Sequence, residues 1–147
     1  MDLKEQLMND LKDAMKEKNV VKKNTVTMIR AAILQYEKDN LTQLDENGII
    51  DIISKELKRR KDAMAEFEKS GRQDLIEELE KEIQIVKAYL PEELSVEELT
   101  QIIKDTIVEV DAKDIKDMGK VMKAVKEKTT GRADGRTINE IVKKELA

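Results

Sequence analysis

The sequence predicts an all-α protein, with an N-terminal helical bundle followed by a small three-helix C-terminal domain. The 147 residues include one Pro and five Gly, so residues that favour turns are scarce. Glu, Lys, Leu, Met and Ala, which recur throughout the chain, are among the strongest helix formers. Apolar residues also repeat at helical spacing in almost every segment, which favours helix over strand along nearly the whole chain.

Four helices are expected in the first part of the chain, each with one apolar stripe. Thr42, followed three positions later by Asp45, predicts the N-terminal cap of the third of these helices. Gly71 is expected to end that helix, because glycine readily adopts the left-handed conformation of a helix C-terminus. The expected helices cover residues 2–18, 20–39, about 46–70 and 73–90.

The proline marks a boundary between two domains. Pro91 disfavours helix in the preceding residue, and Ser95 with Glu98 forms a capping-box pattern that begins the next helix. We therefore predict an N-terminal domain over residues 1–92 and a C-terminal domain over residues 93–147. Three helices are expected in the second domain, over residues 96–110, 118–128 and 137–146.

The composition excludes several kinds of chemistry. The chain has no Cys and no His, so the usual ligand sets for zinc, haem and iron–sulfur clusters are missing. Without His it also lacks the side chain most often used as a general base near neutral pH. We expect no metal, no cofactor and no catalytic residue, and the sequence favours a binding protein over an enzyme.

Two further observations concern the location of the protein. The apolar runs are far shorter than the ~20 residues that span a bilayer. Residues 1–5 lack the apolar core of a secretory signal, so we expect no membrane association and a cytoplasmic address. Charged residues make up 41% of the chain but the net charge is only −4, so any nucleic-acid site must be local.

Residues 118–136 form the most basic segment that also contains a tight turn. They carry six positive and two negative side chains, a net charge of +4. On a helical wheel the lysines lie opposite the apolar face of the segment. Gly131 is expected to close one helix and Asp134 to cap the next, which leaves backbone N–H groups beside two arginines. The candidate phosphate-binding residues are Lys116, Lys120, Lys123, Arg132 and Arg136. The alternative is a corner that serves only packing.

A second basic cluster lies on the predicted third helix and contains Lys58, Arg59, Arg60 and Lys61. It is dense enough to attract phosphates, but acidic residues on the same helix also favour a solvated face with i,i+4 ion pairs. Arg30, within an otherwise apolar helix, is expected to pair with a carboxylate. No Gly-rich nucleotide-binding pattern or strand is present, so nucleotide hydrolysis has no support.

Five motifs resemble the stand-alone members of the GatB/YqeY family, in the same order and over nearly the whole chain. They are Leu57-Lys58-Arg59-Arg60-Lys61-Asp62, Gly71-Arg72-Gln73-Asp74-Leu75, Tyr89-Leu90-Pro91-Glu92, Met118-Gly119-Lys120-Val121-Met122 and Gly131-Arg132-Ala133-Asp134-Gly135. The resemblance implies a helical bundle followed by a three-helix tail. In the amidotransferase B subunit the related tail contacts tRNA, and the catalytic domain lies elsewhere.

The resemblance therefore implies a tRNA-facing surface in the tail, at positions Gly119, Lys120, Lys123, Gly131, Arg132, Ala133 and Asp134. The resemblance does not imply that this chain catalyses amide transfer. Glutamine-dependent amide transfer uses an ATP- and metal-dependent kinase-like domain and a separate glutaminase subunit, and this sequence has no counterpart of either.

Three functions follow as hypotheses. The first is an accessory tRNA-binding protein related to glutamine-dependent aminoacyl-tRNA amidotransferases, without its own catalytic centre. The second is a protein–protein adaptor for an aminoacyl-tRNA synthetase or an amidotransferase subunit. The third, implied by the family, is a carbon–nitrogen ligase with glutamine as amido-N-donor. The aromatic residues Tyr36, Phe67 and Tyr89 all precede the tail, so a folded, double-helical RNA is favoured over a single strand.

Overall fold

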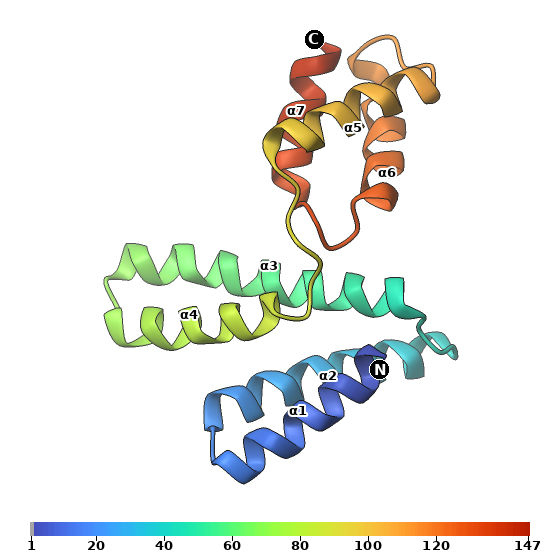
Figure 1. The fold of residues 1–147 in the computed structure, drawn as a ribbon. Helices are drawn as coiled ribbons and strands as arrows, with labels where there is room; N and C mark the ends of the chain where they lie inside the picture. Colours follow the sequence, from blue (N-terminus) through green and yellow to red (C-terminus); the bar gives the residue numbers. More distant parts are fainter. Residues whose placement is uncertain (1) are drawn as a thin grey trace. The chain divides into compact units, whose positions relative to one another are not determined.

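The computed structural model describes residues 2–147 and confirms the all-α class. Within these residues it contains seven α-helices, one short 3-10 helix and no strand. They are α1 (Leu3–Glu17), α2 (Val20–Asn40), α3 (Glu46–Ser70), α4 (Gln73–Lys87), α5 (Val96–Glu109), η1 (Ile115–Asp117), α6 (Met118–Lys128) and α7 (Gly135–Leu146) (Figure 1). The chain divides into two compact units, the first ending at Leu90 and the second formed by Pro91–Ala147.

The first unit consists of two antiparallel hairpins, α1–α2 and α3–α4 (Figure 1). Helix α2 packs against both α3 and α4, so it joins the two hairpins. Almost all of the buried side chains between them are aliphatic, because each helix buries only its apolar stripe. The core residues are Leu7, Val26, Ile29, Ile33, Ile49, Ile52, Ile53, Leu57, Leu79, Ile83, Val86 and Tyr89.

Tyr89 connects the end of the first unit to its beginning. Its side chain is only 7% exposed, and its hydroxyl donates a hydrogen bond to the Asp10 carboxylate on α1. Burial, and to a lesser extent the Asp10 carboxylate, raises the pKa of Tyr89, so the hydroxyl remains a donor at neutral pH. Helix α4 ends at Lys87 rather than at the predicted residue 90, because a tight turn after it places Tyr89 in the core.

Side chains cap several helices as the sequence suggested, with one correction. Ser95 and Glu98 form the predicted capping box at the start of α5. Thr42 does not cap α3: the cap is Asp45, whose carboxylate accepts a hydrogen bond from the Gly48 N–H. The reason is that the Thr42 N–H donates to the Glu37 carbonyl and so belongs to the end of α2.

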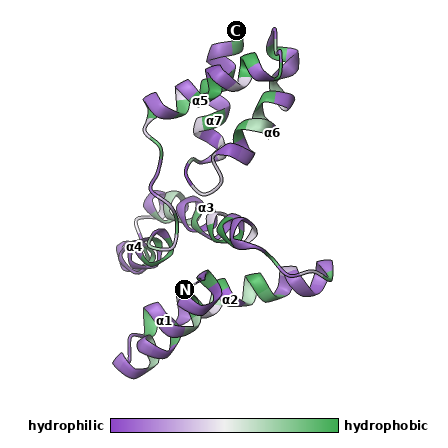
Figure 2. Cartoon of the chain, turned by 45° about the vertical axis from the view of Figure 1, so that its right-hand side comes forward, coloured by the Kyte–Doolittle hydropathy of each residue, from purple (hydrophilic) through white to green (hydrophobic). Residues whose placement is uncertain are grey.

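The second unit is a three-helix bundle of α5, α6 and α7. Each helix has a hydrophilic and a hydrophobic side (Figure 2). Asp134 caps α7 as predicted, and Gly131 has a positive φ of 75°, but α6 ends before it, at Lys128, and α7 begins at Gly135. The core residues of this unit are Leu99, Ile103, Val121, Val125, Ile138, Val142 and Leu146.

Two exposed glycines provide a matched test of these helix ends. A Cβ atom added at Gly71 or at Gly119 would meet no other atom within 4 Å, but only Gly71 has a positive φ, of 71°. We expect Gly71→Ala to lower the free energy of unfolding by about 1–2 kcal/mol, because an L-residue is strained there. Gly119→Ala should raise it by about 0.5 kcal/mol, because Ala favours helix. Denaturant unfolding of both variants measures this, and a change of the same sign in both would contradict the assignment.

Candidate nucleic-acid interface

Four lysines follow one another along the outer side of η1 and α6. They are three or four residues apart, a spacing that makes successive side chains neighbours on a helix surface. All four are exposed, and three of them were among the candidates from the sequence. These residues, Lys116, Lys120, Lys123 and Lys126, are called the lysine row below.

The opposite side of α6 fixes the direction of the lysine row. Val121 and Val125 are 0% exposed and lie in the core of the second unit, and Met118 and Met122 pack against the same core. Turning the helix to bury the lysines would expose these apolar side chains, so the arrangement predicted by the helical wheel is the one observed.

The charges of the lysine row are largely uncompensated. Among residues 2–147, no carboxylate lies within ion-pairing distance of its four ammonium groups. The acidic neighbour Asp117 has a lowered pKa, mainly because its carboxylate accepts a hydrogen bond from the Lys113 N–H, with a smaller contribution from the charge of Lys120. The row therefore presents positive charge to solvent, and this charge can attract phosphate groups.

Arg132 has a different position from the lysines. It is half-buried, its Nε donates to the Glu92 carbonyl at 3.0 Å, and its own carbonyl accepts from the Leu94 N–H at 2.9 Å. These two bonds hold the segment before α5 against the α6–α7 loop. Its charge also contributes to the lowered pKa of Glu98, after the hydrogen bonds with Ser95. Arg132 therefore has, at least in these two bonds, the packing role that was the alternative to phosphate binding for this corner.

Arg136 continues the basic surface from Lys126, at the end of the lysine row, onto the first turn of α7. Arg136 is exposed in the first turn of α7 and has no ion-pair partner among the described residues. A Cβ atom at Gly135 would lie 3.9 Å from Cε of Lys126, so the end of the lysine row lies beside the start of α7. Lys126 was missed as a candidate, although its spacing of three from Lys123 was visible in the sequence.

Lys128, at the end of α6, is not part of this surface. Its Nζ pairs with the Glu109 carboxylate and donates to Thr106 Oγ1 at 3.0 Å. One of the six positive charges counted in residues 118–136 is therefore neutralised by a contact with α5.

The second basic cluster is not one exposed surface. Lys58 and Arg59 are exposed and Lys61 is half-buried, but Arg60 is only 6% exposed. The predicted patch of four is therefore wrong for Arg60. The reason is its place on the helix: Arg60 follows Leu57 by three residues, so it shares the apolar stripe of α3.

Arg60 instead links three helices of the first unit. On its own helix, its Nη1 donates to the Glu56 carbonyl at 3.1 Å. Its Nε lies 3.5 Å from Glu82 Oε1 on α4, and its Nη2 donates to Met28 Sδ on α2 at 3.6 Å. Glu56 is itself buried and also contacts Arg59 Nη1 at 3.1 Å. These contacts indicate a structural role for Arg60.

The described residues contain neither a metal-binding cluster nor a membrane-spanning helix. Within residues 2–147, no group of three or more His, Cys, Asp or Glu side chains is arranged to hold a metal ion. No helix in that part of the chain is long and apolar enough to cross a membrane. The lysine row with Arg136 is the candidate site for a nucleic acid.

The sequence matches a known family and several fungal proteins. A family described as Yqey-like protein matches residues 4–146. A protein of Lachancea thermotolerans named altered inheritance of mitochondria protein 41, mitochondrial, is 41% identical over 85 residues, or 57% of this chain and 46% of that protein. The protein of the same name from Pyrenophora tritici-repentis is 27% identical over 125 residues, 82% of this chain and 69% of that protein. The chain spans about half the length of the first of these relatives.

The relatives correct the expected location. They are named as mitochondrial proteins, which contradicts the cytoplasmic address expected from the N-terminal residues. That expectation was wrong because it rested on the lack of a secretory signal. Mitochondrial targeting segments are of another kind, amphipathic and rich in Arg and Ser, so the lack of a secretory signal is no evidence against them.

The different environments of Arg60 and Lys58 give a test of the second basic cluster. Arg60→Ala should lower the free energy of unfolding by about 3 kcal/mol, because it leaves the buried Glu56 carboxylate with Arg59 as its remaining partner. The control Lys58→Ala removes an exposed charge and should change it by less than about 0.5 kcal/mol. Denaturant unfolding compares the two, and equal stability of the variants would contradict the structural role of Arg60.

Proposed function

Because the chain belongs to the Yqey-like protein family, we propose that it is an accessory tRNA-binding protein related to the glutamine-dependent aminoacyl-tRNA amidotransferases. The observation that carries the proposal is the lysine row, whose four ammonium groups face solvent without carboxylate partners among residues 2–147. Phosphate contacts from such residues supply affinity that does not depend on sequence.

The form of the surface favours a folded RNA. The second unit has no aromatic residue, so it cannot stack unpaired bases on aromatic rings. What it offers is a helix face with positive charges at regular spacing, together with Arg136 at the start of α7. Double-helical RNA is recognised mainly through its shape, its phosphates and its 2′-hydroxyl groups, which suits a surface of this kind.

We propose binding without catalysis because the chain lacks the side chains that amide transfer usually requires. With no Cys and no His, a nucleophile would have to come from Ser, Thr or Lys without the usual base. The amide transfer that the resemblance suggests would then belong to partner subunits. Release of ammonia or glutamate from glutamine by the purified protein, with ATP and mischarged tRNA present, would contradict this part of the proposal.

The salt dependence of tRNA binding tests the proposal directly. With the lysine row and Arg136 as five phosphate contacts, log K against log salt concentration should have a slope of about −4.5. Lys120→Gln with Lys123→Gln should weaken binding and reduce the slope by about 2, since two contacts are lost. Fluorescence anisotropy with labelled tRNA measures both effects.

A matched double variant controls for overall charge. Lys12 and Lys16 are also exposed and one helical turn apart, but they lie on α1 of the first unit, so Lys12→Gln with Lys16→Gln should leave the slope unchanged. Equal loss in both double variants would indicate attraction by net charge alone and reject the lysine row. Absence of tRNA binding, with association to a synthetase or amidotransferase subunit that survives nuclease treatment, would instead favour the adaptor function.

A further inference from the structure

A pocket in the first unit contains an arginine without an acidic partner. The pocket lies between α1 and α2 and has a volume of about 510 Å³. Arg30 lines it, but across residues 2–147 no carboxylate lies within ion-pairing distance of its guanidinium. The carboxylate partner expected for Arg30 from the sequence is therefore not found. The guanidinium of Arg30 is half-buried and has hydrogen-bond donors that no carboxylate of the described residues pairs with, so it can hold an anion that enters the pocket.

The other charges of the pocket are located at its far end. Lys4 Nζ lies 2.6 Å from Glu37 Oε2, and the same oxygen accepts a hydrogen bond from the Leu44 N–H at 2.8 Å. These contacts lower the pKa of Glu37, so its carboxylate is ionised and already satisfied. Glu37 is seven residues from Arg30, which corresponds to about 10 Å along the helix. Glu5, the other acidic residue of the pocket, directly follows Lys4 and belongs to the same end.

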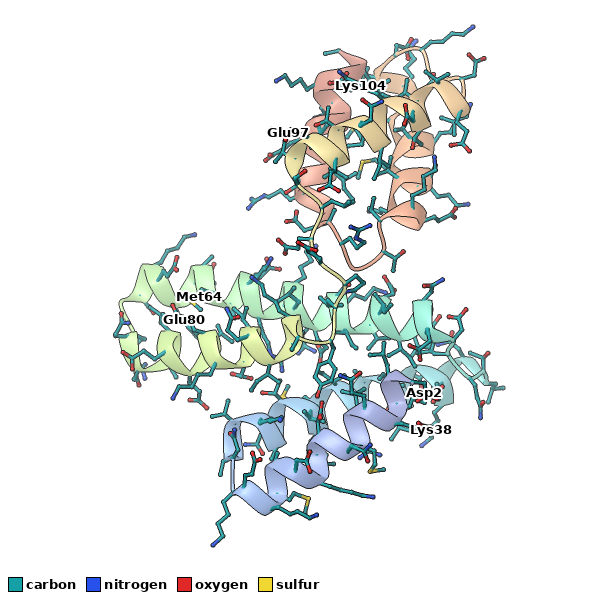
Figure 3. All side chains as sticks on the ribbon, viewed as in Figure 1. Asp2, Lys38, Met64, Glu80, Glu97 and Lys104 are labelled. Carbon is teal, nitrogen blue, oxygen red and sulfur yellow. The ribbon has the colours of Figure 1, made fainter. Side chains whose placement is uncertain are left out.

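Apolar side chains, together with Asn9, line the pocket between the two ends. Leu7 and Ile33 form the buried floor, with 1% and 3% of their surface exposed. Met8 and Leu34 stand at the rim and are 37% and 59% exposed, so they retain apolar surface that a ligand can cover. One end of the pocket thus carries the Arg30 guanidinium, its middle is mainly apolar, and its other end holds the Lys4–Glu37 ion pair. Asp2 and Lys38, labelled in Figure 3, mark the end of the hairpin where that ion pair lies.

The size of the pocket favours a small molecule over a protein. Its volume falls within the roughly 300–1,000 Å³ of small-molecule sites. Nine residues line it, whereas a stable protein interface uses roughly 20–30 residues a side. The occupant that fits has a single negative group at one end and an aliphatic chain no longer than the distance between Arg30 and the ion pair.

We propose that this pocket binds a small amphipathic carboxylate, with the carboxylate on Arg30 and the aliphatic chain over Leu7, Ile33 and Leu34. A planar guanidinium can hold a carboxylate through two parallel hydrogen bonds. The chain covers apolar surface at the rim that is otherwise in water. This site lies within the first unit and is independent of the lysine row, which lies in the second.

Octanoate is a suitable probe for the full-length protein, with octylammonium as the probe of opposite charge. Titration followed by amide NMR shifts should show saturable binding of octanoate, with the shifts concentrated in α1 and α2. Octylammonium should bind at least about tenfold more weakly, because it cannot pair with Arg30. Arg30→Gln should weaken octanoate binding by about tenfold or more. Arg30→Lys keeps the positive charge but loses the planar pair of donors. Its affinity for octanoate should therefore lie between those of the unchanged protein and Arg30→Gln.

Two further variants keep the result interpretable. Arg136→Gln removes an exposed arginine from the second unit and should leave octanoate binding unchanged. Leu34→Glu places a negative charge at the exposed rim of the pocket and should abolish octanoate binding, because the two negative charges repel each other. The proposal is overturned if octanoate does not bind saturably, if octylammonium binds equally well, or if Arg30→Gln has no more effect than Arg136→Gln. Retained tRNA binding by Arg30→Gln is expected, because the two sites are separate.

Discussion

The structure depends on the burial of one apolar stripe per helix. Charged residues make up 41% of the chain and aromatic residues only 2%, so each helix has a single aliphatic face to place in a core. The buried side chains therefore form two separate hydrophobic cores, one in each unit. Because burying a stripe fixes the rotation of its helix, it also decides which charged side chains reach solvent and which do not.

The same constraint gives the basic residues three different environments. The lysine row lies opposite Val121 and Val125 and is left in water without carboxylate partners among the described residues. Arg60 shares the stripe of α3 and is buried, where contacts with three helices satisfy its charge in large part. Arg132 lies between these cases, since it is half-buried and hydrogen-bonded to the Glu92 carbonyl.

Half-buried Arg30 and buried Arg60 show that a cation removed from solvent can indicate either binding or a structural role. Both belong to helices that pack in the first unit. Arg60 has Glu56 and Glu82 close by, so its charge is compensated within the protein. Arg30 faces a pocket and has no such neighbour in the described chain. The difference lies in the acidic partners of Arg60, with Glu56 one helical turn away and Glu82 on another helix, and it separates a packing residue from a candidate ligand contact.

The sequence by itself determined the helical class, the helix before Gly71, the capping box of Ser95 and the outward direction of the lysine row. These features follow from local periodicity and from contacts within a few residues, which a linear pattern records. Only the tertiary structure decided that Arg60 pairs with Glu82 and that Lys128 pairs with Glu109, because each pair joins two helices that are distant in sequence. No local spacing contains that information.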